Sequence, residues 1–333
     1  MNNKTIVGLV IVALLVGGVA YFGFNKSNPA PTSQEPIKIG IVVYPDSGVF
    51  YIAQEEGFFK KEGVNVDLVQ IPVDNIFAAL QTNQVQMATA FAPDTMTILA
   101  DAGILAKQIL VTSLSSGADG MLVTKNIQKI SDLKDKKVYL TLGYPEHFFF
   151  DYEAQKAGLA PTDVQLVNLN SEEVGASFVS GKIDAGMTWE PWLSQGLERK
   201  DGKILFTSRD DLGVVISELV ARNDLVASRR EDVKKIMRAY FDAANWWNEN
   251  VDKGNAIISK NFSLTAQEFA PMKNTMILAT PQINAEKFDK TNPLSVYALV
   301  DMASAFYLRD GVIKTGTTGE AVTDSSLFND LHY

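Results

Sequence analysis

Short apolar runs alternate with amphipathic segments from residue 37 to residue 207, and this alternation limits the possible folds more than any other feature of the chain. In the first part, runs with the length and composition of β-strands cover 37–43, 64–71, 86–91 and 105–113. Segments in which apolar residues recur at helical spacing lie between them, at 49–56, 74–82 and 93–101. This order predicts an α/β fold with a mainly parallel sheet and helices on its faces.

The same alternation restarts after residue 117 and predicts a second lobe. Strand-like runs now cover 120–124, 137–142, 164–169, 184–189 and 203–207. The run Val214–Arg222 mirrors the first of these and indicates the return to the first sheet. We therefore expect a discontinuous lobe 1, residues 37–117 and 216–310, and a lobe 2, residues 118–215. Two α/β lobes joined by two crossing segments form a hinge, which places a ligand site in the cleft between them.

The two ends of the chain differ from this body. Residues Thr5–Phe24 form an uncharged, mostly apolar run of 20, long enough to span a bilayer as a helix. It predicts a membrane anchor, or a signal segment cleaved after the small residues at 18–20. Residues 25–36, rich in Pro and Ser, predict an extended linker. In either case the body is exported and lies outside the cytoplasmic membrane, tethered by the helix or released by cleavage. The Gly- and Thr-rich segment 311–333 predicts a loose C-terminal tail.

Composition excludes several classes of function. The net charge of −9 without a basic stripe argues against nucleic-acid binding. The chain has no cysteine, so disulfides, thiolate metal sites, cysteine nucleophiles and a lipid anchor on cysteine are all excluded. Two histidines are too few for a multi-histidine metal site. No HExxH, G-x-S-x-G or G-x-G-x-x-G pattern occurs. We expect no metal, no cofactor and no catalytic residue.

The candidate ligand site consists of turns that follow predicted strands, where open α/β sheets bind their ligands. These turns combine aromatic rings, short hydroxyl side chains, carboxylates and helix N-termini, which suits a small organic anion. A zwitterion also fits if Asp46 or Glu190 meets an amine. The candidate residues are Pro45, Asp46, Ser47, Phe91, Ala92, Ser113, Gly143, Tyr144, Pro145, Glu146, His147, Trp189 and Glu190.

The turn Gly143–His147 is the most informative of these segments, because it joins a predicted strand to a predicted helix. The first N–H groups of that helix have no partner inside it and favour an anion. A histidine in the first helical turn is explained by a bound ligand at that end. Two alternatives remain open: His147 could point at water from a plain loop, and Trp189 could cap the core.

Several segments carry a resemblance to a known family. A pattern of small, acidic and aromatic residues follows the first strand, and it is met by Ala53, Glu55, Gly57, Phe59, Gly63, Val64 and Val66. The strand at 86–91, the pair Gly143 and His147, and the pair Trp189 and Pro191 support it. Together these cover most of residues 37–310. The chain resembles the periplasmic substrate-binding proteins of ABC importers, in the group that binds aliphatic sulfonates, taurine, nitrate or thiamine-precursor pyrimidines.

The resemblance implies a type II periplasmic-binding-protein fold, a monomer, and delivery of a solute to an ABC permease. It implies that Gly143–His147 grip an anionic head group, with an alkyl sulfonate or taurine as the favoured ligand. A pyrimidine thiamine precursor, nitrate or another small solute remain alternatives. An enzyme on the same fold would need an acid–base pair, which only His147 and Glu190 offer, and the cysteine-rich motif of the related pyrimidine-synthesising enzyme is absent. A sensory ectodomain is the third class. We expect a binding protein and no enzyme.

Overall fold

The computed structural model describes residues 35–331. From Pro36 onward these residues form one compact unit. The hydrophobic segment 5–24 and almost all of the linker 25–36 lie outside the described residues, so both remain predictions from the sequence. Within the described range, no helix combines the length and the apolar character that crossing a membrane requires.

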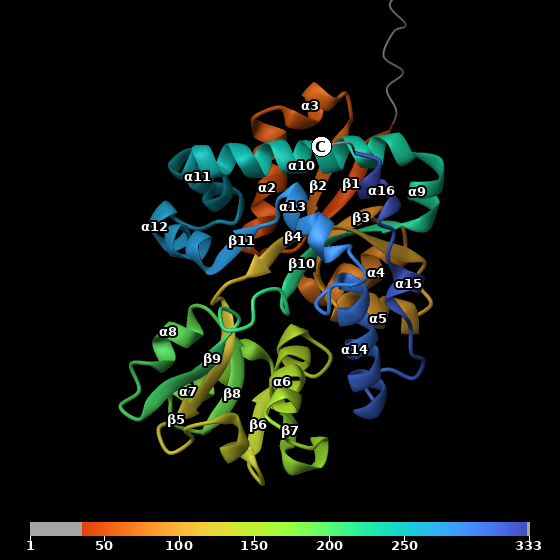
Figure 1. Ribbon diagram of the computed structural model, residues 1–333. Helices are drawn as coiled ribbons and strands as arrows, with labels where there is room; N and C mark the ends of the chain where they lie inside the picture. Colours follow the sequence, from red (N-terminus) through yellow and green to blue (C-terminus); the bar gives the residue numbers. More distant parts are fainter. Residues whose placement is uncertain (1–34, 332–333) are drawn as a thin grey trace, which may run out of the picture. The chain divides into compact units, whose positions relative to one another are not determined.

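Lobe 1 contains a six-stranded sheet in the order β11-β4-β10-β3-β1-β2 (Figure 1). The strands are β1 (Ile37–Ile41), β2 (Val66–Gln70), β3 (Met87–Ala92), β4 (Ala106–Ser115), β10 (Ile216–Arg222) and β11 (Met276–Leu278). β1 is parallel to β2 and β3, whereas β10 is antiparallel to β3 and β4. The prediction of a mainly parallel sheet is therefore wrong, and the sheet is mixed. The reason is that β10 re-enters lobe 1 at the end where β4 leaves it, so that Ile216 pairs with Leu114.

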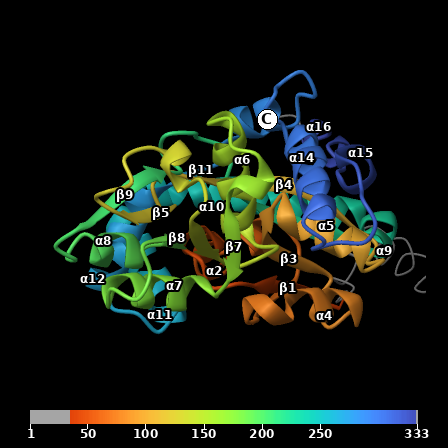
Figure 2. The ribbon, with the colours of Figure 1, turned by 90° about the horizontal axis from the view of Figure 1, so that it is seen from below.

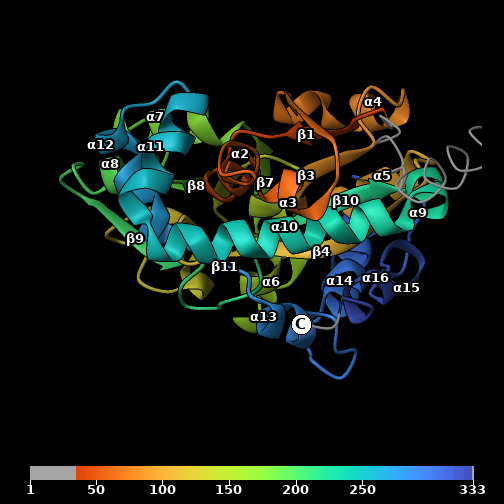
Figure 3. The same cartoon turned by 90° about the horizontal axis from the view of Figure 1, so that it is seen from above.

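Helices cover both faces of this sheet. On one face lie α2 (Gly48–Glu55), α3 (Phe58–Glu62), α10 (Arg230–Glu249) and α11 (Val251–Asn261), and on the other α4 (Ile76–Gln81), α5 (Asp94–Asp101) and α14 (Val296–Arg309). Figure 3 shows the long α10 running along its face. Its buried residues recur at three- and four-residue spacing from Val233 to Trp247, which gives the helix one continuous apolar stripe for the sheet. Lobe 1 also contains the shorter helices α9 (Asn223–Ser228), α12 (Ala266–Phe269) and α13 (Pro281–Lys287).

Lobe 2 contains a five-stranded mixed sheet in the order β7-β6-β8-β5-β9. The strands are β5 (Asp119–Thr124), β6 (Lys137–Leu140), β7 (Gln165–Asn168), β8 (Ala185–Trp189) and β9 (Gly202–Thr207). α6 (Pro145–Lys156) packs on one face through three consecutive buried phenylalanines, 148–150. α7 (Ser171–Val179) and α8 (Trp192–Gly196) pack on the other. Figure 2 shows α6 between this sheet and α14, and α6 contacts both β8 and α14.

Two crossing segments, 116–118 and 208–215, connect the sheets. They are hydrogen bonded to each other. The Ser115 and Ser208 hydroxyl oxygens lie 2.6 Å apart, and the Gly117 N–H donates to the Ser208 hydroxyl at 2.8 Å. The Ser208 N–H donates to the Asp119 carbonyl at 2.8 Å. Any relative movement of the lobes therefore involves two short connecting segments that are hydrogen bonded to each other.

The segment after Gly311 is not loose, contrary to the expectation from its Gly and Thr content. It contains α15 (Gly319–Val322) and α16 (Ser326–Asn329), and Leu327 is completely buried in the lobe 1 core. Thr323 bridges to Gln108 of β4, so this segment also extends the backbone contacts of the sheet. Local composition could not predict this, because the packing partner lies some 200 residues earlier in the chain. Short single-turn helices occupy Pro45–Ser47 (η1), Val73–Asn75, Ile130–Leu133, Pro161–Asp163 and Ala270–Thr275.

Candidate ligand-binding cleft

A cleft of about 500 Å³ lies between the lobes and is lined by residues of both. Most of its lining is apolar or aromatic. Six of the residues predicted from the sequence line it: Pro45 and Phe91 from lobe 1, and Tyr144, Pro145, Trp189 and Glu190 from lobe 2. The structure thus brings four separate strand-end turns to one space, as expected where the carboxyl ends of strands face a shared cleft.

Aromatic rings form much of the wall. The rings of Tyr44 and Phe91 meet edge to face with their centroids 5.0 Å apart. Phe262, Phe269 and Met272 close another part of the cleft. The sequence placed these three in a helical region with no functional signal, since apolar residues at helical spacing are typical of a core. Only their position around the cleft identifies them.

Asp46, in η1, lies behind the cleft wall and is 1% exposed. Burial raises the pKa of its carboxyl to about 6, although hydroxyls of Thr112, Ser113 and Ser217 lower it. The Thr112 hydroxyl donates to Asp46 Oδ2 at 2.6 Å. Ser113 is therefore placed at the carboxylate of Asp46 and is not part of the cleft lining.

Asp119 lines the cleft and was missed from the sequence. It opens β5 directly opposite Trp189 of β8, which explains why both reach the same space. The Ser115 hydroxyl donates to Asp119 Oδ2 at 2.5 Å, and burial raises the pKa of the carboxyl to about 6. In the sequence, Asp119 is a single acidic residue next to a crossing segment, and no motif marks it as functional.

Glu146 is 1% exposed in the first turn of α6. Burial is the largest cause that raises the pKa of its carboxyl, to about 7, and the charge of Asp119 adds to it. The Ser171 hydroxyl donates to Oε1 and lowers the pKa. Its other oxygen, Oε2, is buried and finds no hydrogen-bond partner among the residues that the structure describes.

Glu190 lies at the rim of the cleft and caps α8. The backbone N–H and the hydroxyl of Ser194 donate to its carboxylate at 3.1 and 2.9 Å. The adjacent pair Glu172 and Glu173 predicts a solvated helix face. Glu172 is indeed exposed, and it also lines the cleft. The acidic residues that line the cleft, Asp119, Glu172 and Glu190, therefore all belong to lobe 2.

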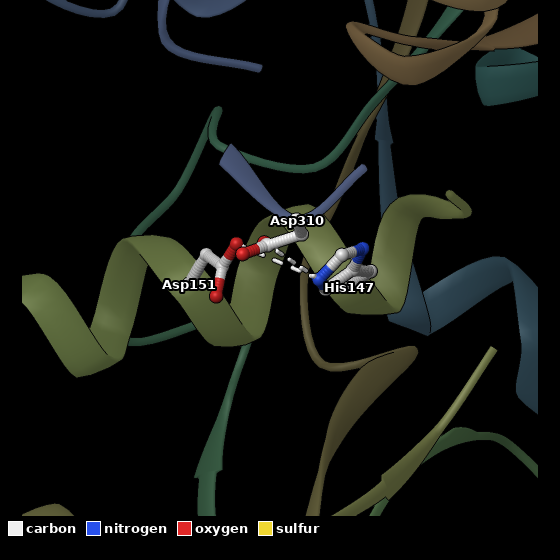
Figure 4. Close-up of side chains that lie close together, drawn as sticks. All are labelled: His147, Asp151 and Asp310. Carbon is white, nitrogen blue, oxygen red and sulfur yellow. Dashed lines mark ion pairs between the residues drawn. The ribbon is translucent and has the colours of Figure 1, made fainter. Parts of the chain in front are cut away.

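His147 is not among the residues that line the cleft, and it is completely buried. Its Nδ1 accepts a hydrogen bond from the Gly143 N–H at 3.2 Å. Its Nε2 faces Asp310, at the end of α14, at 3.3 Å and Asp151 at 3.6 Å (Figure 4). The structure places His147 in a polar contact between α6 and α14. It does not point at water, so that alternative is wrong.

These three side chains could in principle hold a metal ion, since their ligand atoms lie within 4.8 Å of one another. The surrounding contacts do not fit one. Because Nδ1 accepts a hydrogen bond, a neutral imidazole carries its proton on Nε2, the atom that would have to bind the metal. Arg309 also contacts both carboxylates, at 2.7 Å from Asp151 and 2.6 Å from Asp310. A guanidinium already supplies the positive charge there.

The remaining predicted residues lie close to the cleft. Ser47 is buried and precedes α2. Ala92 ends β3, where its backbone is paired with Ile216. Gly143 adopts a positive φ of 82° and lines a smaller pocket that also includes Asp94. A Cβ at Gly143 would lie 2.9 Å from the side chain of Val312, so this turn requires glycine for both reasons.

The chain matches the NMT1/THI5-like family over residues 44–253. It is 27% identical to an aliphatic sulfonates-binding protein of Bacillus subtilis, over 76% of this chain and 77% of the relative. It is 26% identical to the taurine-binding periplasmic protein of Escherichia coli, over 72% of each. Among solved structures, it is similar to the periplasmic aliphatic sulphonate binding protein of Escherichia coli, with a TM-score of 0.71, 19% identity, and coverage of 89% of this chain and 100% of that one.

The structural likeness shows the type II periplasmic-binding-protein fold, here with two mixed sheets. The named relatives are binding proteins, and the prediction of a binding protein rather than an enzyme is confirmed. The family match covers well over half of the chain. The chain belongs to the NMT1/THI5-like family, as a substrate-binding protein of the kind that serves ABC importers.

Proposed function

We propose that this protein is the extracytoplasmic solute-binding component of an ABC importer and captures a small organic solute by closure of its two lobes. The observation that carries the proposal is the cleft of about 500 Å³ with walls from both lobes. A ligand that contacts both walls stabilises the form in which they approach each other. A permease that favours this form would accept the loaded protein and reject the empty one.

The expectation for location and partner rests on the relatives. One of them is named as a periplasmic protein, and the hydrophobic segment 5–24 would export or anchor the body outside the membrane. We expect the protein to be a monomer and to bind an ABC permease.

Two observations bear on the ligand. The relatives named for sulfonates and taurine support the ligand class favoured from the sequence. The chemistry of the cleft opposes a purely anionic ligand, because none of the described residues in its lining is a lysine, arginine or histidine. Taurine, which carries an ammonium, and an aminopyrimidine, which carries a flat ring with N–H donors, suit carboxylates and aromatic walls better than an alkyl sulfonate or nitrate.

Closure can be measured directly because the chain contains no cysteine. Spin labels on Val43→Cys and Glu172→Cys would report the distance across the cleft, since these residues line it from opposite lobes. In the full-length protein we expect a shorter distance and a higher melting temperature with at least one of taurine, an alkanesulfonate, nitrate and an aminopyrimidine.

The matched control is a pair within lobe 1, Val43→Cys with Leu105→Cys, both exposed. Its distance should stay constant with every ligand, because one lobe moves as a body. A panel that changes neither the distance across the cleft nor the melting temperature would argue against a solute-binding function.

A further inference from the structure

Acidic side chains lie at four helix N-termini in and around the cleft. Asp46 lies within η1, directly before α2, and Asp94 is the first residue of α5. Glu146 lies in the first turn of α6. At α8, Glu190 accepts a hydrogen bond from the Ser194 N–H.

This arrangement changes what these turns can bind. Free N–H groups at a helix N-terminus favour an anion. Here each of these turns carries a carboxylate of the protein, so an anionic head group would meet negative charge. Among residues 35–331, none of these carboxylates forms an ion pair with a lysine, arginine or histidine.

A buried carboxylate without a hydrogen-bond or ion-pair partner lowers the stability of the folded protein if it is ionised. Several buried carboxyl groups around the cleft have oxygens of this kind. Glu218 of β10 is completely buried, and within residues 35–331 both of its carboxylate oxygens lack a hydrogen-bond partner. Asp94 Oδ1 and Glu146 Oε2 are also buried, and neither has a partner in this range. A carboxylate in this state either holds a proton or awaits a cation.

We propose, building on the solute-binding function above, that the cleft selects an organic cation: a protonated or quaternary amine carried by a small, flat, apolar body. This ligand class differs in charge from the alkyl sulfonates for which the relatives are named. The charged head supplies the countercharge that the cleft lacks. The flat body packs against its aromatic wall.

The aromatic residues support the cation in a second way. Tyr44, Phe91, Tyr144 and Trp189 all line the cleft, and the face of an aromatic ring attracts a cation within about 6 Å. The carboxylates lie around the same residues, since Asp46, Asp119 and Glu146 all act electrostatically on the Tyr44 hydroxyl. The negative charge and the aromatic wall therefore coincide.

Asp119 is the residue best placed to meet the ammonium. It lines the cleft, is 6% exposed, and belongs to the first residues after a crossing segment. Its carboxylate accepts a hydrogen bond from Ser115, whose hydroxyl also contacts Ser208 on the other crossing segment. A cation at Asp119 thus acts on the hydrogen bonds that join the two lobes.

The test uses four probes that share one ring and differ in head group: benzyltrimethylammonium, benzylamine, benzyl alcohol and phenylmethanesulfonate. Calorimetric titration of the full-length protein at low ionic strength should show that both cations bind at least about tenfold more tightly than the alcohol. The sulfonate should bind more weakly than the alcohol.

Two variants locate the charge. Asp119→Asn should reduce the affinity for both cations about tenfold or more and leave that for benzyl alcohol nearly unchanged. Glu172→Gln, exposed and therefore harmless to folding, should give a smaller loss of the same sign. Asp184→Asn, exposed on lobe 2 and not part of the cleft lining, is the control and should change no affinity.

The possible failures are distinguishable. Cations that bind no better than the alcohol would overturn the inference, as would tighter binding of the sulfonate, and either result would leave the solute-binding function in place. If none of these probes and none of the solutes in the closure experiment binds, both proposals fall.

Discussion

Replacement of Glu146 by glutamine tests whether its buried carboxylate opposes folding. Burial raises the pKa of this carboxyl from an ordinary 4.5 to about 7. The folded protein therefore holds the proton more tightly than the unfolded chain between these two values. The free energy of unfolding then falls as the pH rises through this window, and the loss is complete above the higher value.

The size of the effect follows from the same two values. At ~1.4 kcal/mol for each pH unit, the difference between 4.5 and about 7 corresponds to a cost of about 3 kcal/mol at pH 8, and to less than about 1 kcal/mol at pH 5. Glutamine has no charge to bury and keeps an oxygen that can accept the hydrogen bond from Ser171. Glu146→Gln should therefore be more stable than the unaltered protein at pH 8 and nearly equal to it at pH 5.

Urea unfolding of both proteins at the two pH values measures this difference. The other buried carboxylates are present in both proteins. The difference in free energy of unfolding between the two proteins therefore reports on Glu146 when it is compared at pH 5 and pH 8. Glu56→Gln, at the exposed end of α2, is the matched control and should differ by no more than about 0.5 kcal/mol at either pH. An equal stability gap at pH 5 and pH 8 would refute the reasoning.

Three further substitutions test the packing that holds lobe 1 together, each by urea unfolding. Asn284→Ala removes an amide that bonds both backbone groups of Val111, at 2.9 and 3.0 Å, and should cost about 2–4 kcal/mol, whereas Asn284→Gln should restore part of it. Gly48→Ala places a methyl 2.4 Å from the side chain of Ile258 and should cost about 1–3 kcal/mol; an unchanged stability would mean that α11 moves freely. Leu327→Ala should cost about 2–5 kcal/mol if the C-terminal segment belongs to the core, and a neutral result would contradict its burial.

Much of the fold could be predicted from the sequence because its signals are local. The strand runs and the helical spacing recur at fixed periods, so two α/β lobes followed from them. The direction of β10 did not, because it depends on where the chain returns from lobe 2. The packing of the C-terminal segment against β4 was also missed, because its partners are distant in the sequence.

The candidate site divides in the same way. The strand-end turns could be predicted, and Pro45, Phe91, Tyr144 and Trp189 do line the cleft. Asp119 could not be singled out, because a single acidic residue beside a loop is common at any protein surface. The turn at His147 suggested a functional site. The structure places this side chain against Asp310, which is remote in the sequence, and outside the cleft lining.

By itself the sequence determined the alternating α/β organisation, the likeness to a family and several of the turns that line the cleft. These depend on periodicity and on residues that are neighbours in the chain. Only the tertiary structure decided the charge of the site. Each helix N-terminus, considered alone, favours an anion, but Asp46, Asp119 and Glu146 come from distant segments to the surroundings of one tyrosine. Whether a buried carboxylate meets a cation depends on that assembly in space.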